Sequence, residues 1–450
     1  MSAPLMISVA GIRGIVGESL TPPVVARFAA AFAGGLEPGS VVVGRDARRS
    51  GPMVYRAVAA GLTAAGRDVI DIGLATTPAT QVAVEELQAA GGVILTASHN
   101  PAEWNALKFL SGRGEFLDAE SGAAVKRRYE SGARLWTTFD RLGGESQEPR
   151  ALEWHLKRVL AMPFLDLPAI RGRRLKALVD GCASVGGVAV PRLLRELGCQ
   201  VVELDCEPNG NFTRVLEPLP EHLGTLSARV REARADFGIA LDPDADRAAF
   251  VDASGVPLGE EYSLVLAAQV VLASQPGPVV TNLSTSRIID TVCARAGVPL
   301  HRTPVGEAHV VAGMRAHGAV VGGEGNGGVI VAAAHYGRDG LVAAALVCQA
   351  LAAGTPLRAL GDALPKLCMV KGKLEKADEP WELSVPRLRA AFPEHAADGA
   401  DGLRLSRDEE WVHIRPSGTE PVVRVIAESP SEPRTRELVE RARRALQMAS

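Results

Sequence analysis

The feature that most constrains the fold is a strand–helix–strand pattern that occurs three times along the chain. Each copy opens with a short apolar strand that ends in a small or polar turn. These opening strands lie at 41–46, 178–181 and 279–282. The helix that follows stops at a glycine in each copy, namely Gly66, Gly198 and Gly297. After a second strand and a further apolar strand, each copy reaches a polar loop. The pattern predicts three α/β units whose ligands gather beyond the strand ends.

The last part of the chain departs from this repeat. Helices are expected over 380–392 and about 432–448, with two strands between them that flank Arg415. We therefore predict an α/β protein of three tandem α/β domains with mixed sheets and a smaller C-terminal α+β domain. A length of 450 residues and a hydrophobic content of 47% suffice for several cores. The expected domains span 1–147, 148–256, 257–365 and 366–450.

The first polar loop presents Ser98. It follows the apolar run 92–95, and Asn100-Pro101 prevents the turn from continuing as a helix. The flanking residues lack the two glycines of the serine-hydrolase elbow, which argues against acyl transfer. On an extended segment His99 would project to the opposite face, where it is poorly placed as a base for Ser98. The alternative is a turn whose side chains bond their own backbone.

The second loop carries three carboxylates, those of Asp242, Asp244 and Asp246, followed by Arg247. Several carboxylate oxygens turned toward one point, with no Cys or His nearby, favour Mg²⁺ over zinc. A calcium EF-hand is excluded, because it requires glycine at the sixth position and glutamate at the twelfth, where this chain has Arg247 and Ala253. A solvated acidic turn is the alternative interpretation.

The third loop, 323–328, contains four glycines, so Glu324 and Asn326 supply its only side chains. Such a loop lets backbone and ligand approach closely while the carboxylate and amide bond hydroxyl groups, as in a sugar-binding loop. Because no Gly-Lys-Ser/Thr ending is present, a nucleotide P-loop is excluded. A plain glycine-rich hairpin is the commoner explanation of such a loop taken alone.

The fourth loop lies between two strands near the C-terminus. It combines a guanidinium, two hydroxyls and an unobstructed amide, and a second arginine begins the return strand. These residues are Arg415, Ser417, Gly418, Thr419 and Arg424. The set matches a phosphate dianion. A simple turn would explain the proline and glycine but not the cluster of Arg, Ser and Thr.

In this order, the four loops resemble the signature loops of the α-D-phosphohexomutase superfamily, and the likeness spans essentially the whole chain. Further matches are Gly11-Ile12-Arg13-Gly14, Gly44-Arg45-Asp46 with Arg48 and Ser50, and Val305-Gly306-Glu307. The resemblance implies four domains around a central active-site cleft. In chain order they would be a phosphoserine-loop domain (1–147), a metal-binding domain (148–256), a sugar-binding domain (257–365) and a phosphate-binding C-terminal domain (366–450).

The resemblance also implies an activity: movement of a phosphoryl group between the 6- and 1-positions of a hexose phosphate. Ser98 would carry a phosphoryl group and donate it to the substrate. The bisphosphorylated sugar would turn around and return its other phosphate to the serine. Such chemistry depends mainly on positioning and charge neutralisation.

Roles for individual residues follow from the same resemblance. Catalytic roles fall to Ser98, Lys108, His99 and Arg13, with Lys108 the candidate general acid/base. Substrate-binding roles fall to Arg247, Val305, Gly306, Glu324, Asn326, Arg415, Ser417, Gly418, Thr419 and Arg424. One Mg²⁺ would be held by Asp242, Asp244, Asp246 and the phosphoryl group on Ser98.

Two positions depart from the pattern of the superfamily. Many bacterial members have a histidine where this chain has Gly328, which leaves the proton acceptor open. His335, a few residues further on, is a candidate replacement, although a histidine outside the motif is more often structural. The second departure is Ala106 in place of a glycine, which predicts only a small backbone adjustment.

The substrate is the least determined part of the prediction. Glucosamine 6-phosphate, converted to glucosamine 1-phosphate, is favoured, and mannose and glucose phosphates are the alternatives. A sugar phosphatase or a non-catalytic sugar-phosphate sensor is a further alternative. A net charge of -3 gives no reason to expect nucleic acid or a membrane surface as partner. Six cysteines without a C-x-x-C pair favour the cytoplasm. A monomer or homodimer is expected.

Overall fold

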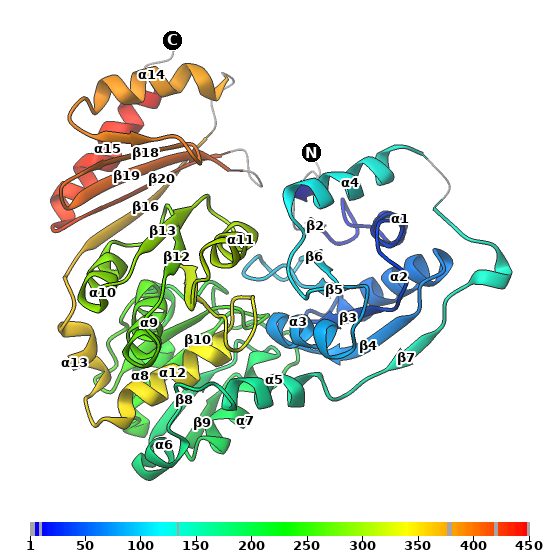
Figure 1. Ribbon diagram of the computed structural model, residues 1–450, viewed down its shortest axis with the longest axis horizontal. Coiled ribbons are helices and arrows are strands. Elements are labelled where there is room, and N and C mark those ends of the chain that lie inside the picture. Colours follow the sequence, from blue (N-terminus) through cyan, green and yellow to red (C-terminus); the bar gives the residue numbers. More distant parts are fainter. Residues whose placement is uncertain (1–4, 9–10, 133–134, 376–379, 418–421, 448–450) are drawn as a thin grey trace.

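The computed structural model describes residues 5–8, 11–132, 135–375, 380–417 and 422–447. This part of the chain forms four β-sheets, one in each of four successive regions (Figure 1). Figure 1 shows the first region on the right in blue and cyan, the second and third in green and yellow, and the last in orange and red at the upper left. The first and last regions therefore lie on different sides of the two central regions (Figure 1).

The first sheet has the strand order β1-β2-β6-β5-β3-β4-β7. Its strands are β1 (Met6–Ser8), β2 (Gly11–Ile15), β3 (Val41–Arg45), β4 (Val69–Leu74), β5 (Gly91–Leu95), β6 (Trp104–Ser111) and β7 (Glu145–Gln147). The helices of this region are α1 (Pro22–Ala33), α2 (Gly51–Ala64), α3 (Thr77–Glu86) and α4 (Ala119–Glu130), and a 3-10 turn, η1, spans Phe139–Arg141. Apolar side chains of α1, α2 and α4 pack on one face, and those of α3 on the other.

The second and third sheets have four strands each, in the orders β11-β10-β8-β9 and β13-β12-β14-β15. The second comprises β8 (Lys176–Asp180), β9 (Gln200–Leu204), β10 (Phe237–Leu241) and β11 (Ala248–Asp252), with α5 (Ala151–Leu160), α6 (Leu167–Arg173), α7 (Gly186–Glu196), η2 (Pro220–His222) and α8 (Gly224–Ala233). The third comprises β12 (Val279–Asn282), β13 (Leu300–Thr303), β14 (Val321–Glu324) and β15 (Gly328–Val331), with α9 (Glu261–Ser274), α10 (Ile288–Ala296), α11 (Glu307–His317), α12 (Gly340–Ala352) and α13 (Leu357–Asp362).

One strand order is common to the first three sheets. In each, a central strand pairs in parallel with two neighbours, and the second of these neighbours pairs with an antiparallel partner. The antiparallel partners are β6 on β5, β11 on β10, and β15 on β14. Each polar loop of the sequence connects one of these antiparallel pairs. The repeat predicted from the sequence therefore places its three loops at equivalent positions.

The glycines that were expected to end the helices have the backbone geometry that this role requires. Gly66, Gly198 and Gly297 have φ angles of 82°, 80° and 67°. Such left-handed conformations close a helix and favour glycine, which has no Cβ to clash with the following carbonyl. Each of the three helices is thereby turned back toward its sheet for the next strand.

The second and third regions share one apolar core. Leu193 of α7, Leu266 of α9 and Leu346 of α12 belong to the same buried cluster, and each is at most 1% exposed. The cluster also includes Ile239 of β10 and Val321 of β14. The strands β10 and β14, which precede two of the polar loops, are therefore packed into the same hydrophobic core.

The C-terminal region forms an antiparallel sheet of order β16-β20-β19-β18-β17. Its elements are β16 (Cys368–Glu375), α14 (Trp381–Ala391), β17 (Ala396–Asp398), β18 (Leu403–Arg407), β19 (Glu410–Pro416), β20 (Val422–Ser429) and α15 (Glu432–Gln447). Leu388 of α14 and Leu438 of α15 pack with Val412 and Val425 of the sheet. The two helices and the hairpin around Arg415 agree with the predicted α+β organisation.

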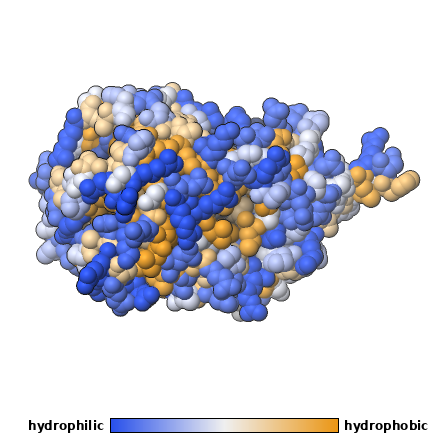
Figure 2. Space-filling model, turned by 90° about the horizontal axis from the view of Figure 1, so that it is seen from below, coloured by the Kyte–Doolittle hydropathy of each residue, from blue (hydrophilic) through white to orange (hydrophobic). Residues whose placement is uncertain are grey.

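The segment around 143–149, where the first expected domain ends and the second begins, includes a short strand. It contains β7, which pairs in parallel with β4 at the edge of the first sheet. The preceding η1 projects from the body of the molecule (Figures 1 and 2), and Phe139 there is 89% exposed. Among the described residues, no helix combines the length and apolar character needed to cross a membrane.

Candidate active site

The Ser98 loop and the aspartate loop meet although they follow strands of different sheets. The Ser98 hydroxyl donates a hydrogen bond to Oδ2 of Asp242 over 2.8 Å. Lys108, on β6, donates from Nζ to Oδ2 of Asp244 over 2.7 Å. Ser98 is 3% exposed and Lys108 is 9% exposed, so these contacts lie almost wholly out of solvent. A hydroxyl, an ammonium and two carboxylates are thus brought within hydrogen-bonding reach.

The buried Arg48 shapes the Ser98 loop. Its guanidinium donates to the backbone carbonyls of four loop residues. The acceptors are Ser98, Asn100, Pro101 and Trp104, at 2.6 to 3.0 Å. Asp46 balances the charge of Arg48 through a 3.1 Å contact. Arg48 is part of the sequence resemblance but could not be assigned a role from it. Its acceptors are backbone carbonyls, and a pattern of side chains does not show which carbonyls lie near an arginine.

The turn at Ser98 overturns the expectation about His99. Ser98 has a φ of 48°, in the left-handed region, so the segment is not extended at this point. The two neighbouring side chains therefore do not project to opposite faces, and His99 Nδ1 lies 3.4 Å from Ser98 Oγ. Burial, together with the nearby Arg247 and Arg13 cations, holds the pKa of His99 well below its usual range. His99 is consequently a neutral imidazole beside the serine.

The three aspartates form a compact buried cluster. Asp242, Asp244 and Asp246 are each 0% exposed, and one carboxylate oxygen of each lies within 4.8 Å of the others. Burial, then repulsion from Asp246 and Asp244, raises the pKa of Asp242 well above its usual value. Burial also disfavours charge on Asp244, but Lys108 outweighs it and the pKa of Asp244 is lowered.

The donor set of this cluster fits a hard divalent cation. Within the described part of the chain, Oδ1 of Asp244 and Oδ1 of Asp246 accept no hydrogen bond although both are buried, and the latter has only a 3.7 Å contact with Nε of Arg247. Buried carboxylate oxygens without a partner are energetically unfavourable unless a cation satisfies them. Oxygen ligands alone suit Mg²⁺. The residues predicted to hold the metal are therefore suitably placed to do so.

Thr77 also belongs to this cluster, and no motif in the sequence points to it. At the start of α3, its hydroxyl donates to Oδ2 of Asp244 over 2.7 Å, and its amide donates to the Asp244 carbonyl over 2.9 Å. Both contacts cross between the first and second regions. Thr77 could not have been found from a motif, because only the docking of α3 against the aspartate loop brings it there.

Arg338 was also missed as a functional candidate. It forms ion pairs with three carboxylates from three different segments. These are Asp246 at 2.5 Å, Glu324 at 2.7 Å and Glu307 at 2.9 Å. Its side chain is 10% exposed. The glycine-rich loop and the aspartate loop are thus joined through one guanidinium.

Arg338 also gives a physical reason for the unexpected Gly328. A Cβ placed on Gly328 would lie 2.3 Å from Cδ of Arg338 and 2.9 Å from its Cγ. A histidine at position 328 is therefore sterically excluded while Arg338 occupies this space. The minor departure at Ala106 is accommodated within β6, where the residue pairs with Arg13 of β2.

In the glycine-rich loop, Glu324 accepts hydrogen bonds on both oxygens. Asn282 and the amide of Gly306 donate to Oε1 over 2.7 and 3.0 Å. Arg338 and Asn326 donate to Oε2, the latter over 3.4 Å. Because a carboxylate has about four acceptor sites, an incoming hydroxyl would most readily replace the long contact from Asn326.

The arginine loop faces the third region through Asp401. Val305 donates its amide to Oδ2 of Asp401 over 2.9 Å, and Nη1 of Arg415 lies 3.9 Å from the same oxygen. Arg415 and Arg424 are directly opposite each other on β19 and β20. Burial, and after it the Arg424 cation, lowers the pKa of Arg415 despite the opposing effect of Asp401. Two adjacent guanidinium groups, those of Arg415 and Arg424, are suited to binding an anion such as a phosphate.

The remaining predicted residues are Arg13, Arg247, Ser417, Gly418 and Thr419. Arg13 donates to Asn100 and thus borders the Ser98 loop. Arg247 donates its amide to Oδ1 of Asp242 over 3.2 Å and directs its guanidinium toward Glu217 at 3.4 Å. Ser417 donates its amide to the carbonyl of Val422. Gly418 and Thr419 lie outside the described residues.

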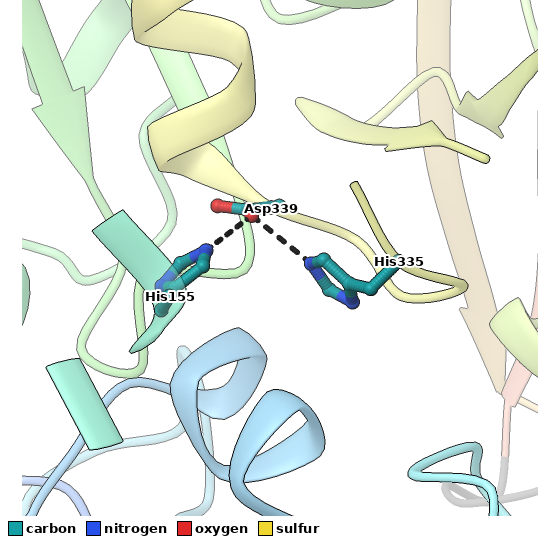
Figure 3. Close-up of side chains that lie close together, drawn as sticks. All are labelled: His155, His335 and Asp339. Atoms are coloured by element: carbon teal, nitrogen blue, oxygen red, sulfur yellow. Dashed lines mark hydrogen bonds and ion pairs between the residues drawn. The ribbon is translucent and has the colours of Figure 1, made fainter. Parts of the chain in front are cut away.

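His335 occupies a different environment from the one a proton acceptor would need. Its Nε2 lies 3.0 Å from Oδ2 of Asp339, and Nε2 of His155 lies 2.6 Å from the same oxygen. Figure 3 shows both imidazoles directed at this carboxylate. All three side chains are at most 1% exposed. The contacts of His335 are therefore those of a buried structural histidine.

Comparison with known proteins covers all four regions. Residues 6–135, 154–255 and 259–368 match "Phosphoglucomutase/phosphomannomutase, alpha/beta/alpha" domains I, II and III, and residues 369–445 match the C-terminal domain of the same family. A "Probable phosphoglucosamine mutase" from Methanopyrus kandleri is 39% identical over 95% of this chain and 94% of its own length. A "Phosphoglucomutase/phosphomannomutase" from Thermococcus kodakarensis is 37% identical over 96% of both chains.

A solved structure has the same architecture. The crystal structure of a phosphoglucomutase/phosphomannomutase family protein from Burkholderia thailandensis superposes with a TM-score of 0.85, at 28% identity, over 99% of this chain and 98% of the other. A chain with this fold and these matches is a phosphohexomutase, which is an isomerase. It belongs to the phosphoglucomutase/phosphomannomutase family, within the α-D-phosphohexomutase superfamily.

Proposed function

We propose that this phosphohexomutase converts glucosamine 6-phosphate to glucosamine 1-phosphate through a phosphoserine at position 98 and a bisphosphorylated sugar. The observation that carries the proposal is the contact of Ser98 with Asp242, next to the Lys108–Asp244 ion pair. This arrangement offers a hydroxyl that can bear a phosphoryl group beside groups that neutralise its charge. Phosphoryl transfer requires chiefly such positioning and electrostatic stabilisation.

In the first half-reaction, the phosphoryl group leaves Ser98 Oγ and joins the free hydroxyl of the sugar phosphate. The sugar hydroxyl loses its proton as its oxygen attacks phosphorus, and Ser98 recovers a hydroxyl. Lys108, which contacts Asp244 in the same cluster, is the group we assign to this proton transfer: it would give its proton to Ser98 Oγ and accept one from the sugar hydroxyl. Neutral His99 and the cation Arg13 border the same loop and orient it.

The aspartate trio would hold Mg²⁺, with the phosphoryl group on Ser98 as a further ligand. When bound, the cation would neutralise charge on the transferring group. Oδ1 of Asp244 and Oδ1 of Asp246 are the oxygens available for it, since their hydrogen bonds are otherwise unmet. Arg247, at the end of the same loop, would balance charge on the substrate side.

The far end of the substrate would be held by the other two loops. Glu324 and Asn326, with Val305 and Gly306, would bind the sugar hydroxyls. Arg415 and Arg424, with Ser417, Gly418 and Thr419, would hold the phosphate that does not react. After the bisphosphorylated intermediate turns around, the same residues serve the second half-reaction. We assign these tasks to domains at 1–147, 148–256, 257–365 and 366–450, in the order phosphoserine, metal, sugar and phosphate.

The choice of glucosamine phosphate rests on the relatives. The 39% identical protein from Methanopyrus kandleri carries the phosphoglucosamine mutase name, whereas the 37% identical one from Thermococcus kodakarensis carries the phosphoglucomutase/phosphomannomutase name. Mannose or glucose phosphate is therefore the second candidate. The cytoplasm is the compartment we infer, because all six cysteines are free thiols.

Parallel assays with glucosamine 6-phosphate, mannose 1-phosphate and glucose 1-phosphate, each primed with its own bisphosphate, test this proposal. We expect isomerisation to be fastest with glucosamine 6-phosphate, and Ser98→Ala to lower it by at least about a thousandfold. Mass spectrometry should find phosphate on Ser98 of the active protein. Substantial turnover by Ser98→Ala would reject the phosphoserine, and release of inorganic phosphate in place of isomerisation would indicate a phosphatase.

A further inference from the structure

The buried Arg338 connects parts of the protein that the proposed mechanism treats separately. Its Nη2 contacts Oδ2 of Asp246, in the candidate metal cluster, and its Nη1 contacts Oε2 of Glu324, in the glycine-rich loop. Its Nε contacts Oε2 of Glu307, at the start of α11. Each nitrogen of the guanidinium thus serves a different carboxylate. Such a planar, fixed arrangement of donors is specific to arginine.

The backbone that follows Arg338 is anchored independently. Asp339 caps the N-terminus of α12, and its Oδ1 accepts the amides of Leu341 and Val342. Its other oxygen, Oδ2, accepts from His155 and His335, which Figure 3 shows on either side of it. The next residue, Gly340, donates its amide to the carbonyl of Ala245, within the aspartate loop. Arg338 is therefore held by a segment that is itself fixed to the metal-side loop.

The neighbouring Gly328 is consistent with a dedicated place for this side chain. Gly328 is not among the glycines with a positive φ, so its backbone does not require glycine. The constraint is steric, because a Cβ there would lie 2.3 Å from Cδ of Arg338. A real Cβ at this distance would force a shift, and Arg338, which is held by three ion pairs, is the side chain that would have to move. Position 328 and Arg338 thus depend on each other.

Arg338 also determines which oxygen of Asp246 remains available. The guanidinium engages Oδ2, whereas Oδ1 accepts no hydrogen bond and has only Nε of Arg247 nearby, at 3.7 Å. On the opposite side, the same guanidinium holds Oε2 of Glu324. Without Arg338, three buried carboxylates would lose their shared counter-charge, and repulsion would drive them apart or toward the protonated form.

We propose that Arg338 is a positioning residue that sets the geometry of the metal ligand Asp246 and of the sugar-binding Glu324 at the same time. The inference rests on the proposed function, which assigns the metal and the sugar to these two carboxylates. Lysine cannot substitute, since a single ammonium cannot reach three carboxylates in the directions that the guanidinium does. The role differs from catalysis, because Arg338 acts through its neighbours.

The test compares Arg338→Lys and Arg338→Met with Arg158→Met as a matched control. Arg158 also bridges two carboxylates, Glu85 and Glu86, but away from the site. Calorimetric titration with Mg²⁺ alone gives a readout independent of activity. We expect Mg²⁺ affinity to fall and KM for the sugar phosphate to rise, each by about tenfold or more, in both Arg338 variants. Arg158→Met should change neither by more than about twofold.

Two results would overturn the inference. One is unchanged Mg²⁺ affinity together with unchanged KM in a folded Arg338→Lys protein. The other is a Mg²⁺ affinity that falls only in proportion to thermal stability, since that would indicate a general structural role. Failure of the proposed function can be distinguished from failure of this inference. If the proposed function is wrong, the unmodified protein will isomerise none of the sugar phosphates, whatever the Arg338 variants do.

A double-mutant cycle covers the case in which Arg338→Met folds poorly. Gly328→Ala alone should displace Arg338 and weaken Mg²⁺ binding by a similar factor. Arg338→Ala combined with Gly328→Ala should be no worse than Arg338→Ala alone, because the clash has disappeared. Such non-additivity is the signature of two residues acting as one unit. Losses that simply multiply would show that Gly328 and Arg338 act independently and would contradict the proposal.

Discussion

At the scale of single residues, the aspartate trio is divided into oxygens that are satisfied by the protein and oxygens that are not. Oδ2 of Asp244 accepts from Lys108 and Thr77, while Oδ2 of Asp246 accepts from Arg338. The Oδ1 atoms of both residues are left buried without a hydrogen bond. Unequal use of the two oxygens is what a carboxylate shows when one of them is reserved for a cation.

Asp244→Asn should therefore weaken Mg²⁺ binding and reduce mutase activity by about a hundredfold or more, because the amide removes the negative charge that a cation requires. Mg²⁺-dependent rates and a Mg²⁺ titration by calorimetry measure both effects. Asp140→Asn, at an exposed carboxylate on η1, is the control and should behave like the unmodified protein. An Asp244→Asn protein with the original metal titration would contradict the assignment of this ligand.

At the scale of secondary-structure elements, the start of α9 carries a buried carboxyl group. Glu261 is 8% exposed and accepts the amide of Ser286. Burial raises the pKa of Glu261 to about 8, although Lys371 opposes the shift. In the unfolded chain the same carboxyl has an ordinary pKa of about 4.3. The folded state therefore holds a proton that the unfolded state releases between these two values.

This difference predicts a pH dependence of stability. Because the folded state binds more protons between about pH 4.3 and pH 8, the contribution of Glu261 to stability is complete below pH 4.3 and is lost as pH rises toward 8. Glu261→Gln removes this term, so its stability relative to the original should improve by at most about 3 kcal/mol between pH 5 and pH 7. Chemical denaturation at both pH values measures the change.

One result would contradict this prediction for Glu261. If the difference in unfolding free energy between Glu261→Gln and the original protein is the same at pH 5 and pH 7, Glu261 is ionised in the folded state and the interpretation is wrong. Glu382→Gln, in the first turn of α14, is the matched control. This exposed carboxyl shows how much of any pH effect comes from the loss of one carboxyl on the surface.

At this scale, the sequence predicts those features of secondary structure that depend on residues close together along the chain. Local sequence patterns predict three kinds of feature: the glycines that end three helices, the strands that are followed by polar loops, and the hairpin around Arg415. Arg48, Thr77 and Arg338 escaped prediction because their partners are carbonyls or carboxylates in distant segments. The orientation of His99 was wrongly expected because a left-handed residue, Ser98, interrupts what looked like extended backbone.

At the scale of the whole molecule, the shared strand order explains how distant segments come to one place. In the first three sheets the polar loop joins the third strand of the unit to its antiparallel partner. Contacts between Ser98 and Asp242, and between Arg338 and both Asp246 and Glu324, then bring these loops together. The fourth region adds the paired Arg415 and Arg424 from a different architecture.

Arg415→Ala tests the contribution of this last region. Removing one of two adjacent cations should raise KM for the hexose phosphate by about tenfold or more while leaving Mg²⁺ affinity unchanged, because the metal cluster belongs to another region. Steady-state kinetics and the Mg²⁺ titration separate the two effects. Arg407→Ala, an exposed arginine on β18 of the same sheet, should leave both unchanged. Unaltered KM and kcat in Arg415→Ala would show that the phosphate is held elsewhere.

The apolar core common to the second and third regions has a consequence for the reaction cycle. A doubly phosphorylated sugar that reverses end for end between the two half-reactions needs room to rotate. The two central sheets cannot separate to provide it without exposing Leu266 and Leu346 to water. In the proposed cycle, the freedom to admit, turn and release the ligand would then lie with the first and fourth regions, whose apolar cores are separate from this one.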